Sequence, residues 1–290
     1  MIGFGTRLEQ AIDGHGRLCV GIDPHPYLLS QWGLGDDSAG LRDFGLRVVE
    51  ASAGRAGIVK PQVAFFERHG SAGFAALEEV LRAARAAGLV VIADAKRGDV
   101  GSSVEAYGQA WLTPGSPLEA DAMTVSAFQG VGSITAPLEL AARHGKGLFV
   151  LAATSNPEAA AIQTAVIGSG ACSGLTVAAG IVADVTDWNL GDPAARIASV
   201  GVVLGATVDF AAYGIDFAAN GIDTAASDGR PGTPILAPGF GHQGARFDQV
   251  DAIYGAAASR TIVAASRSIL AAGPSGLAAA ITSHANEVGA

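Results

Sequence analysis

The segment 94–99 (DAKRGD) holds two acids and a lysine whose spacing suits catalysis by fixed charges. Asp94 and Lys96 are two residues apart, so on a strand their side chains lie on the same side. Lys60 can join them from a neighbouring strand, and Asp99 lies three residues beyond Lys96. Such an alternating set can place an ammonium against a developing carbanion and a carboxylate near a leaving carboxylate. A structural ion-pair network is the alternative interpretation.

Lysine is scarce in this chain. Of the 18 basic residues, only Lys60, Lys96 and Lys146 are lysines, and the rest are arginines. Because lysine carries a compact, titratable ammonium and arginine does not, the few lysines are candidates for chemistry. Lys60 and Lys96 fall near the ends of apolar runs. Lys146 comes just before the apolar run 147–154, so we expect it to be a solvated surface charge on the face opposite to the chemistry.

A second polar group lies late in the chain, in 238–244 (PGFGHQG) and 266–268 (SRS). Glycines let backbone N–H groups approach a phosphate, and Arg267 can bind one through two parallel hydrogen bonds. An ordinary tight turn is the alternative interpretation. His25 and His242 are candidate general bases, although a capping or surface role fits each of them better.

Eight short apolar runs predict the elements that must position these residues. The runs are apolar almost throughout, which is typical of parallel strands buried on both faces. Alanine-rich stretches with helical spacing lie between them, as in Leu77, Val80, Leu81 and Ala84. The runs are 18–23, 57–62, 89–94, 121–126, 147–154, 200–207, 234–239 and 261–266.

Strands that alternate with helices in this way predict an α/β protein with the (β/α)8 fold of a TIM barrel, and a doubly wound open sheet is the alternative. In such a barrel the chemistry lies at the C-terminal ends of the strands, where Asp23 and Ser155 also fall. We expect a single domain over 1–290, with insertions near 156–199 and 218–233.

Composition excludes several classes of protein. Hydrophobic residues make up 49% of the 290 residues and charged residues 16%, which excludes a disordered chain. The net charge of −9 argues against a nucleic-acid partner. The apolar runs are shorter than the ~18–20 residues that span a membrane, and the N-terminus lacks the apolar core of a secretory signal. Cys19 and Cys172 predict no disulfide framework. We therefore expect a cytoplasmic protein.

Metal chemistry is also disfavoured by the sequence. No group of His, Cys and Glu residues has the spacing of a metal site. Asp94 and Asp99 could hold Mg²⁺ together with a substrate phosphate, but the lysine between them disfavours a cation.

Six segments together resemble the orotidine 5'-monophosphate decarboxylase family, and in particular a bacterial type 2 subgroup with GIDP and VKPQ. They occur in the order found in that family and extend over most of the chain. The segments are VGIDPH, VKPQVAFFE, DAKRGD, LAATSNPEA, PGFGHQG and ASRSIL.

The resemblance implies roles for the charged residues. Lys60, Asp94, Lys96 and Asp99 match the family's charged tetrad. Lys96 would protonate C6 of the pyrimidine as CO2 leaves, and Asp94 would lie near the substrate carboxylate. Lys60 would bridge the acids and the ribose. Asp99 would come from the other subunit of a homodimer, which would then have shared active sites.

The resemblance also implies a set of substrate contacts. Val100 and Ser103, where the family often has Ile and Thr, would accompany Asp99 across the dimer. Asp23 would hold a ribose hydroxyl, and Ser155 would read the pyrimidine amide. The phosphate would be held by Gln243, Ser266 and Arg267.

The sequence therefore predicts decarboxylation of orotidine 5'-monophosphate to uridine 5'-monophosphate, the last step of de novo pyrimidine nucleotide synthesis, with no metal or organic cofactor. One alternative is a Mg²⁺-dependent sugar-phosphate lyase or aldolase of the same superfamily. Such enzymes usually have an acid where Lys60 stands, so Lys60 argues against it. The other alternative is a non-catalytic barrel that binds a nucleotide.

Overall fold

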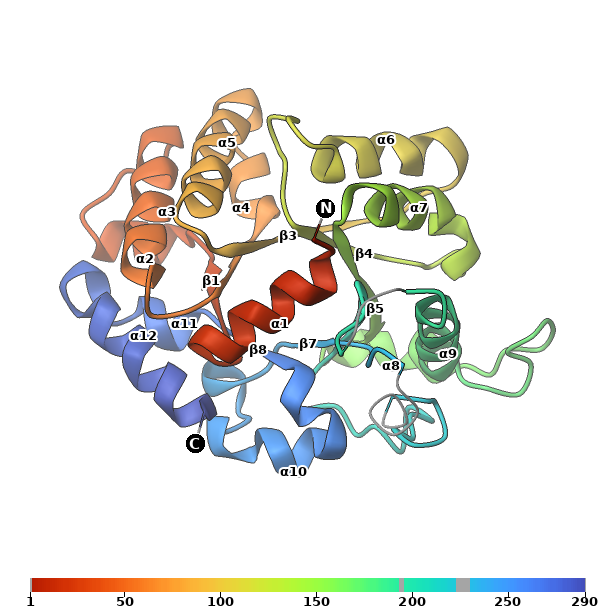
Figure 1. The fold of residues 1–290 in the computed structure, drawn as a ribbon. Helices are drawn as coiled ribbons and strands as arrows, with labels where there is room; N and C mark the ends of the chain where they lie inside the picture. The colour runs from red at the N-terminus through yellow and green to blue at the C-terminus, as the bar shows by residue number, and fades with distance from the viewer. Residues whose placement is uncertain (1, 193–195, 223–229, 290) are drawn as a thin grey trace.

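Eight parallel strands form a closed barrel in chain order, as Figure 1 shows. The computed structural model describes residues 2–192, 196–222 and 230–289. Each predicted apolar run supplies one strand, which confirms the barrel and excludes the open sheet. The strands are β1 (Leu18–Ile22), β2 (Ile58–Pro61), β3 (Val90–Arg97), β4 (Ala122–Val125), β5 (Gly147–Ala153), β6 (Val200–Leu204), β7 (Ile235–Ala237) and β8 (Thr261–Ala265).

The longer helices surround this barrel because they present an apolar face to its interior. In α5, for example, Leu77, Val80, Leu81 and Ala84 are buried, and these are the residues whose spacing predicts the helix. The α-helices are α1 (Phe4–His15), α2 (Pro26–Gln31), α3 (Ser38–Ser52), α4 (Val63–Glu67), α5 (Gly70–Ala86), α6 (Gly101–Leu112), α7 (Thr135–His144), α8 (Ala160–Gln163), α9 (Val177–Asn189), α10 (Val250–Tyr254), α11 (Arg267–Leu270) and α12 (Gly273–Gly289). Short 3₁₀ helices occupy Val131–Ile134, Pro157–Ala159, Gly241–Gln243, Phe247–Gln249 and Gly255–Arg260.

Helix α1 lies across the end of the barrel at which the strands begin (Figure 1). Phe4 and Leu8 of this helix are fully buried, and the Phe4 ring meets Phe149 of β5 edge-on with centroids 6.0 Å apart. Arg7 pairs with Asp121 and donates to the Gly145 carbonyl at 3.0 Å. The helix therefore closes this end of the barrel and leaves the other end for chemistry.

The expectation that Lys146 is a solvated surface charge is wrong. Its side chain is only 7% exposed, and its Nζ donates to Glu119 Oε1 at 2.8 Å. Burial alone would raise the pKa of Glu119, but Lys146, the Gly115 N–H and Arg85 together hold it below its ordinary value. Lys146 is buried because α1, which also forms the Arg7–Asp121 ion pair, covers the end of the barrel at which the strands begin, called the floor below. Asp121 lies 3.8 Å from the Lys146 ammonium as well.

The stretch 156–199 contains both a barrel element and an extension. Helix α9 packs against β5 and β6 as an ordinary barrel helix. Residues 164–176, between α8 and α9, extend away from the barrel in Figure 1, with an antiparallel bridge between Val166 and Thr176 at their base. Of the stretch 218–233, residues 223–229 lie outside the described residues.

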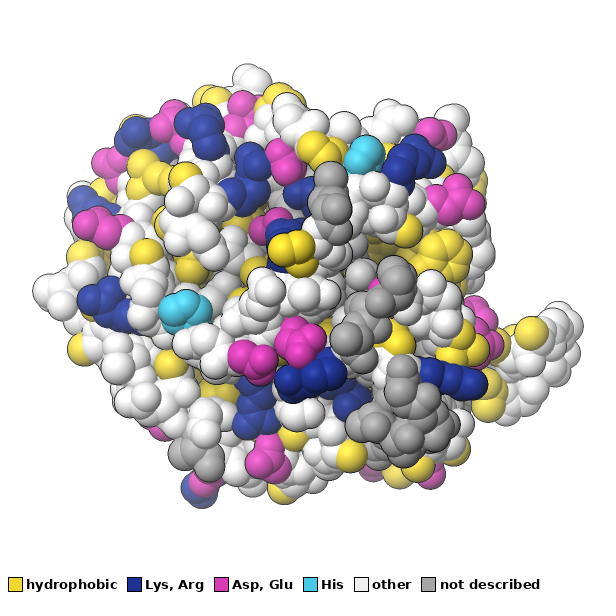
Figure 2. Space-filling model, viewed as in Figure 1, with side chains coloured by type: hydrophobic (Ala, Val, Ile, Leu, Met, Phe, Trp, Pro, Cys, Tyr) yellow, Lys and Arg dark blue, Asp and Glu magenta, His cyan; other side chains and the backbone are white. Residues whose placement is uncertain are grey.

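The surface carries charges of both signs. On the face that bears α1, acidic and basic side chains are interspersed (Figure 2). Within the described part of the chain, no helix is long and apolar enough to cross a membrane.

Candidate active site

The charged cluster predicted from the sequence assembles around Asp94, near the C-terminal ends of β2 and β3. Oδ2 of Asp94 accepts hydrogen bonds from Lys60 Nζ at 2.7 Å and Gln62 Nε2 at 2.9 Å. Oδ1 accepts from Lys96 Nζ at 2.6 Å and Thr124 Oγ1 at 2.9 Å. A carboxylate has about four lone-pair positions, so these donors fill all of them. The position and direction of the negative charge are thereby fixed.

The two buried charges of this cluster keep each other ionised. Burial alone would raise the pKa of Asp94, but the Lys60 and Lys96 ammonium groups hold it well below its usual range. Burial alone would lower the pKa of Lys60, but the charges of Asp94 and Asp23 outweigh it and raise the pKa above its ordinary value. Both residues are therefore charged throughout the neutral range.

Lys96 has an unusual backbone. Its φ is +47°, and it is the only non-glycine residue with a positive φ in the described part of the chain. The pairing of β3 with β4 shifts register between Ala93 and Arg97, so Lys96 lies in a bulge of the strand. Its side chain is 47% exposed although its Nζ contacts Asp94. The ammonium is thus held by Asp94 on one side, while the rest of the side chain is exposed at the C-terminal end of the barrel.

Asp99 is not brought into contact with the other three charges. It follows β3, and its Oδ1 accepts the backbone N–H of Val100 at 2.8 Å. Among the described residues Asp99 forms no ion pair. Val100 is 52% exposed, and Ser103 is exposed on the first turn of α6. These three residues thus lie at the surface beside the site.

The predicted phosphate-binding residues line a second, adjoining part of the site. A cavity of about 100 Å³ is lined by Asp23, Lys60, Gln243, Ser266 and Arg267, among others, and the 238–240 and His242 positions also border it. It is smaller than the ~300–1,000 Å³ of pockets that hold a whole ligand, and suits a phosphoryl group. Lys60 therefore joins this cavity to the Asp94 cluster.

Buried polar atoms in this cavity have no partner from the protein. Asp23 Oδ1 and Ser266 Oγ are inaccessible to solvent and form no hydrogen bond within the described part of the chain. Buried polar groups are rarely left unpaired, and both residues line the cavity, so a water molecule or a polar ligand in it is the expected partner. Gly239, Gly241 and Gly244 have positive φ, which lets the loop turn sharply at the cavity wall.

Ser155 lies at the rim but not in this cavity. It follows β5 and is exposed, beside Gly205 at the end of β6. His25 holds the N-cap position of α2 without a side-chain capping bond, and its ring packs on Phe65 at 4.3 Å. Burial and, to a smaller extent, Arg267 lower the pKa of His25, against the opposing charge of Asp23.

Two members of the cluster, Gln62 and Thr124, are absent from the sequence interpretation. Gln62 lies two residues after Lys60, a spacing that places both on one side of an extended strand. Thr124 is the polar residue in the otherwise apolar strand AMTV. The spacing of Gln62 and the polarity of Thr124 are visible in the sequence, but only the pairing of the strands places both residues beside Asp94.

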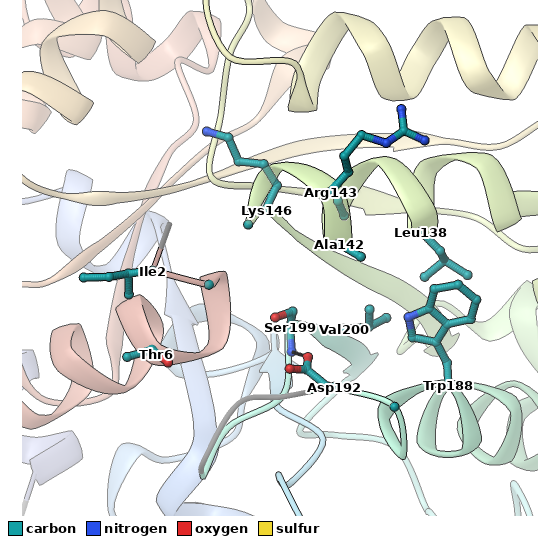
Figure 3. Close-up of a pocket in the computed structure, with 14 residues that line it drawn as sticks. Ile2, Thr6, Leu138, Ala142, Arg143, Lys146, Trp188, Asp192, Ser199 and Val200 are labelled. Carbon is teal, nitrogen blue, oxygen red and sulfur yellow. Dashed lines mark hydrogen bonds between the residues drawn. The ribbon is translucent and has the colours of Figure 1, made fainter.

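A larger cavity than the one of about 100 Å³ lies elsewhere in the structure. A cavity of about 810 Å³ lies at the opposite end of the barrel, between α1, α7 and α9 (Figure 3). Figure 3 shows that the charged ends of Lys146 and Arg143 point away from it, and Lys146 is already paired with Glu119. The size of this cavity is therefore no guide to the chemistry. Within the described residues, no His, Cys, Asp and Glu side chains are grouped to hold a metal ion.

The chain is similar to known proteins over nearly all of its length. It is 49% identical over 264 residues to an orotidine 5'-phosphate decarboxylase of Nocardioides sp. (strain ATCC BAA-499 / JS614), with 89% of each chain covered. It is 46% identical over 260 residues to one of Streptomyces coelicolor, covering 89% of this chain and 86% of the relative.

Solved structures show the same fold. A Streptomyces avermitilis protein, provisionally named orotidine 5'-phosphate decarboxylase, has a TM-score of 0.89 and 44% identity over 99% of this chain and 95% of its own. An OMP decarboxylase of Leishmania donovani has a TM-score of 0.74 and 28% identity, with 99% and 98% covered. The family profile matches residues 16–281. The chain therefore belongs to the orotidine 5'-phosphate decarboxylase / HUMPS family.

Proposed function

We propose that this protein decarboxylates orotidine 5'-monophosphate (OMP) to uridine 5'-monophosphate (UMP) and CO2, the last step of de novo pyrimidine nucleotide synthesis. The observation that carries the proposal is the Asp94 carboxylate, which holds the Lys60 and Lys96 ammonium groups at 2.7 and 2.6 Å. Lys60 also borders a cavity that suits a phosphoryl group. The family and the names of the relatives support the same reaction.

In this reaction the bond between C6 and the carboxylate carbon breaks, and its electron pair stays on C6 as CO2 leaves. Lys96 donates the proton that forms the new C6–H bond, and solvent then restores its ammonium. Asp94 lies near the substrate carboxylate, and Lys60 bridges the acids and the ribose. A very slow uncatalysed reaction needs a barrier reduction of ~20 kcal/mol. No single hydrogen bond supplies it, so fixed charges and phosphate binding share it.

The second part of the site holds the ribose phosphate. Asp23 accepts a ribose hydroxyl, which satisfies its otherwise unpaired Oδ1. Gln243, Ser266 and Arg267 bind the phosphate, and the positive charge of Arg267 matches its negative charge. Ser155 reads the pyrimidine amide from the rim of β5. The reaction uses no metal and no organic cofactor.

The working unit is a homodimer with shared sites, in which each chain is a single barrel domain. Asp99, Val100 and Ser103 enter the partner's site. The surface position of Asp99 beside the exposed Val100 side chain supports this arrangement. The free thiols of Cys19 and Cys172 suit the reducing cytoplasm.

One assay separates this function from its rivals. Purified protein is mixed with OMP in the presence of EDTA, and the absorbance of the orotidylate is followed. We expect turnover that EDTA does not change. Loss of turnover in EDTA would indicate a Mg²⁺-dependent lyase or aldolase. UMP binding without any turnover would indicate a non-catalytic nucleotide-binding barrel.

A further inference from the structure

We infer that Thr124 is a positioning residue for this decarboxylation, because its hydroxyl holds the Lys96 backbone and the Asp94 carboxylate in one fixed arrangement. The inference rests on the proposed function for its kinetic consequence. Its structural part concerns the bulge of β3 and stands independently of the substrate.

The strand pairing places Thr124 opposite the bulge. Ala93 of β3 pairs with Met123 of β4, and the next pair is Arg97 with Val125. Three residues of β3, at 94–96, therefore face Thr124 alone. In a regular parallel pair every second residue donates its N–H to the partner strand, and a bulge removes some of those partners.

The Thr124 side chain replaces a missing backbone partner. The backbone N–H of Lys96 donates to Thr124 Oγ1 at 2.9 Å. A residue with a Cβ is disfavoured at the φ of +47° that Lys96 adopts, so this conformation persists only where surrounding contacts hold it. The hydroxyl of Thr124 supplies such a contact at the residue itself.

The same hydroxyl is also joined to the carboxylate. Thr124 Oγ1 donates to Asp94 Oδ1 at 2.9 Å, and this is the oxygen that accepts from Lys96 Nζ. A hydroxyl has one proton and two lone pairs, so it can donate to Asp94 while it accepts from Lys96. Thr124 is 1% exposed, and its β-branched side chain has few rotamers, so its direction is fixed.

For the reaction, these contacts fix the position and direction of the Lys96 ammonium. Its backbone and its carboxylate partner are both tied to one atom of β4, so its Nζ is placed before substrate binds. Misplacement of a reacting group by about 1 Å can lower a rate by about 100-fold. Thr124 does not line the cavity proposed for the phosphate, so we expect ground-state binding to depend little on this hydroxyl.

The first test compares Thr124→Val, which keeps the shape and loses the hydroxyl, with Thr124→Ser, which keeps the hydroxyl. We expect kcat for OMP to fall by about 10- to 100-fold in Thr124→Val. KM and the Kd of UMP should stay within about threefold. Thr124→Ser should recover most of kcat. Equal kcat losses in the two variants, or a Thr124→Val enzyme with wild-type kcat, would overturn the inference.

Thr261→Val is the matched control, because Thr261 is a fully buried barrel threonine whose hydroxyl donates to the Ala257 carbonyl at 2.9 Å, away from the site. It should lose stability and keep its kcat. A kcat loss equal to that of Thr124→Val would mean that any buried hydroxyl has this effect, which contradicts the inference.

A crystal structure of Thr124→Val tests the positioning without any assay. We expect Lys96 to leave its positive φ, or its Nζ to move off Asp94 Oδ1. An unchanged Lys96 and Asp94 would overturn the inference even if activity fell. If wild-type protein failed to decarboxylate OMP, the proposed function would fail while this structural result would still stand. If Thr124→Val did not fold, the kcat and the crystal structure of Thr124→Ser would test the inference instead. The retained hydroxyl should preserve both the wild-type kcat and the position of Lys96, and loss of either would overturn the inference.

Discussion

At the scale of single residues, the proposed chemistry depends on one carboxylate whose hydrogen-bonding positions are all filled. Asp94 receives two ammonium groups, an amide and a hydroxyl, so its charge is fixed in place without a mobile counter-ion. In the proposed reaction the substrate carboxylate approaches this fixed charge and leaves as neutral CO2, while Lys96 would face the carbon that gains electrons. Differential stabilisation of this kind acts on the transition state more than on the bound substrate.

Lys96→Ala should therefore remove turnover while UMP binding stays nearly intact. General-acid groups contribute about 10²- to 10⁴-fold, and we expect a loss at the upper end of that range. Lys96→Arg should fail almost as badly, because a guanidinium is a poor proton donor and is bulkier. Steady-state kinetics with OMP and calorimetric titration with UMP measure the two effects. Turnover near the wild-type level in the Arg variant would remove Lys96 from the mechanism.

The depressed pKa of Asp94 also predicts how stability depends on pH. Because the folded-state pKa lies below the unfolded value of about 3.9, ionised Asp94 stabilises the fold above that pH, and the contribution disappears as pH falls through the folded-state pKa. Asp94→Asn leaves two lysines unpaired and should cost about 3 kcal/mol of unfolding free energy at neutral pH.

That cost should shrink below about pH 4, because acid there protonates Asp94 of the unfolded wild-type chain while the folded protein keeps it ionised. Urea unfolding of both proteins at pH 7, 5 and 3 measures the difference. A difference that stayed constant down to pH 3 would contradict the depressed pKa. Gln109→Ala is a matched control, since its amide donates to an exposed carboxylate, that of Glu105 on the same helix, and not to a member of the cluster.

At the scale of elements, the backbone of the loop after β7 and of the start of α11 shapes the cavity proposed to hold the phosphate. A Cβ on Gly241 would lie 2.9 Å from Ser268 Oγ, and its φ of +68° disfavours any other residue. Gly132, by contrast, has open space around its Cα and no positive φ. The two glycines therefore differ in what an added methyl group would disturb.

Gly241→Ala should weaken UMP binding by about tenfold and leave uridine binding unchanged, because only UMP has a phosphate to lose. Gly132→Ala should change neither affinity. Fluorescence or calorimetric titration with both ligands is sufficient. An equal loss of affinity for UMP and uridine in Gly241→Ala would show that the loop does not hold the phosphate.

At the scale of the whole molecule, the closed end of the barrel and the candidate active site lie opposite each other. The floor is closed by α1, by the Arg7–Asp121 pair and by the buried Lys146–Glu119 pair. The charged cluster and the phosphate cavity lie at the other end, which is the usual place for catalysis in this fold. The proposed dimer adds Asp99 to that end from a second chain.

Mixed dimers test whether the sites are shared. Lys96→Ala and Asp99→Ala should each be inactive alone, but a mixed dimer would have one site with both lesions and one with neither. Random re-pairing of equal amounts makes half of the dimers mixed, so activity should recover to roughly a quarter of wild type. Two different affinity tags establish that subunits have exchanged. Background activity after proven exchange would show that Asp99 does not act across an interface.

The sequence by itself determined the barrel and the placing of its chemistry. Buried parallel strands require continuous apolar runs, and this local pattern located all eight strands. Because parallel strands end at one rim, polar residues at the run ends, such as Lys60 and Asp94, had to lie together. The six segments of family resemblance then indicated the reaction, and the comparisons support it.

Only the tertiary structure decided which neighbours complete the site. Thr124 and Gln62 reach Asp94 through the register of three strands and a bulge, and register depends on contacts between residues far apart in sequence. The left-handed Lys96 arises from that bulge, although the two-residue spacing alone had predicted a regular strand. Lys146 is buried because α1 folds back over the floor. Burial is a property of the assembled chain, and no local pattern around a single lysine encodes it.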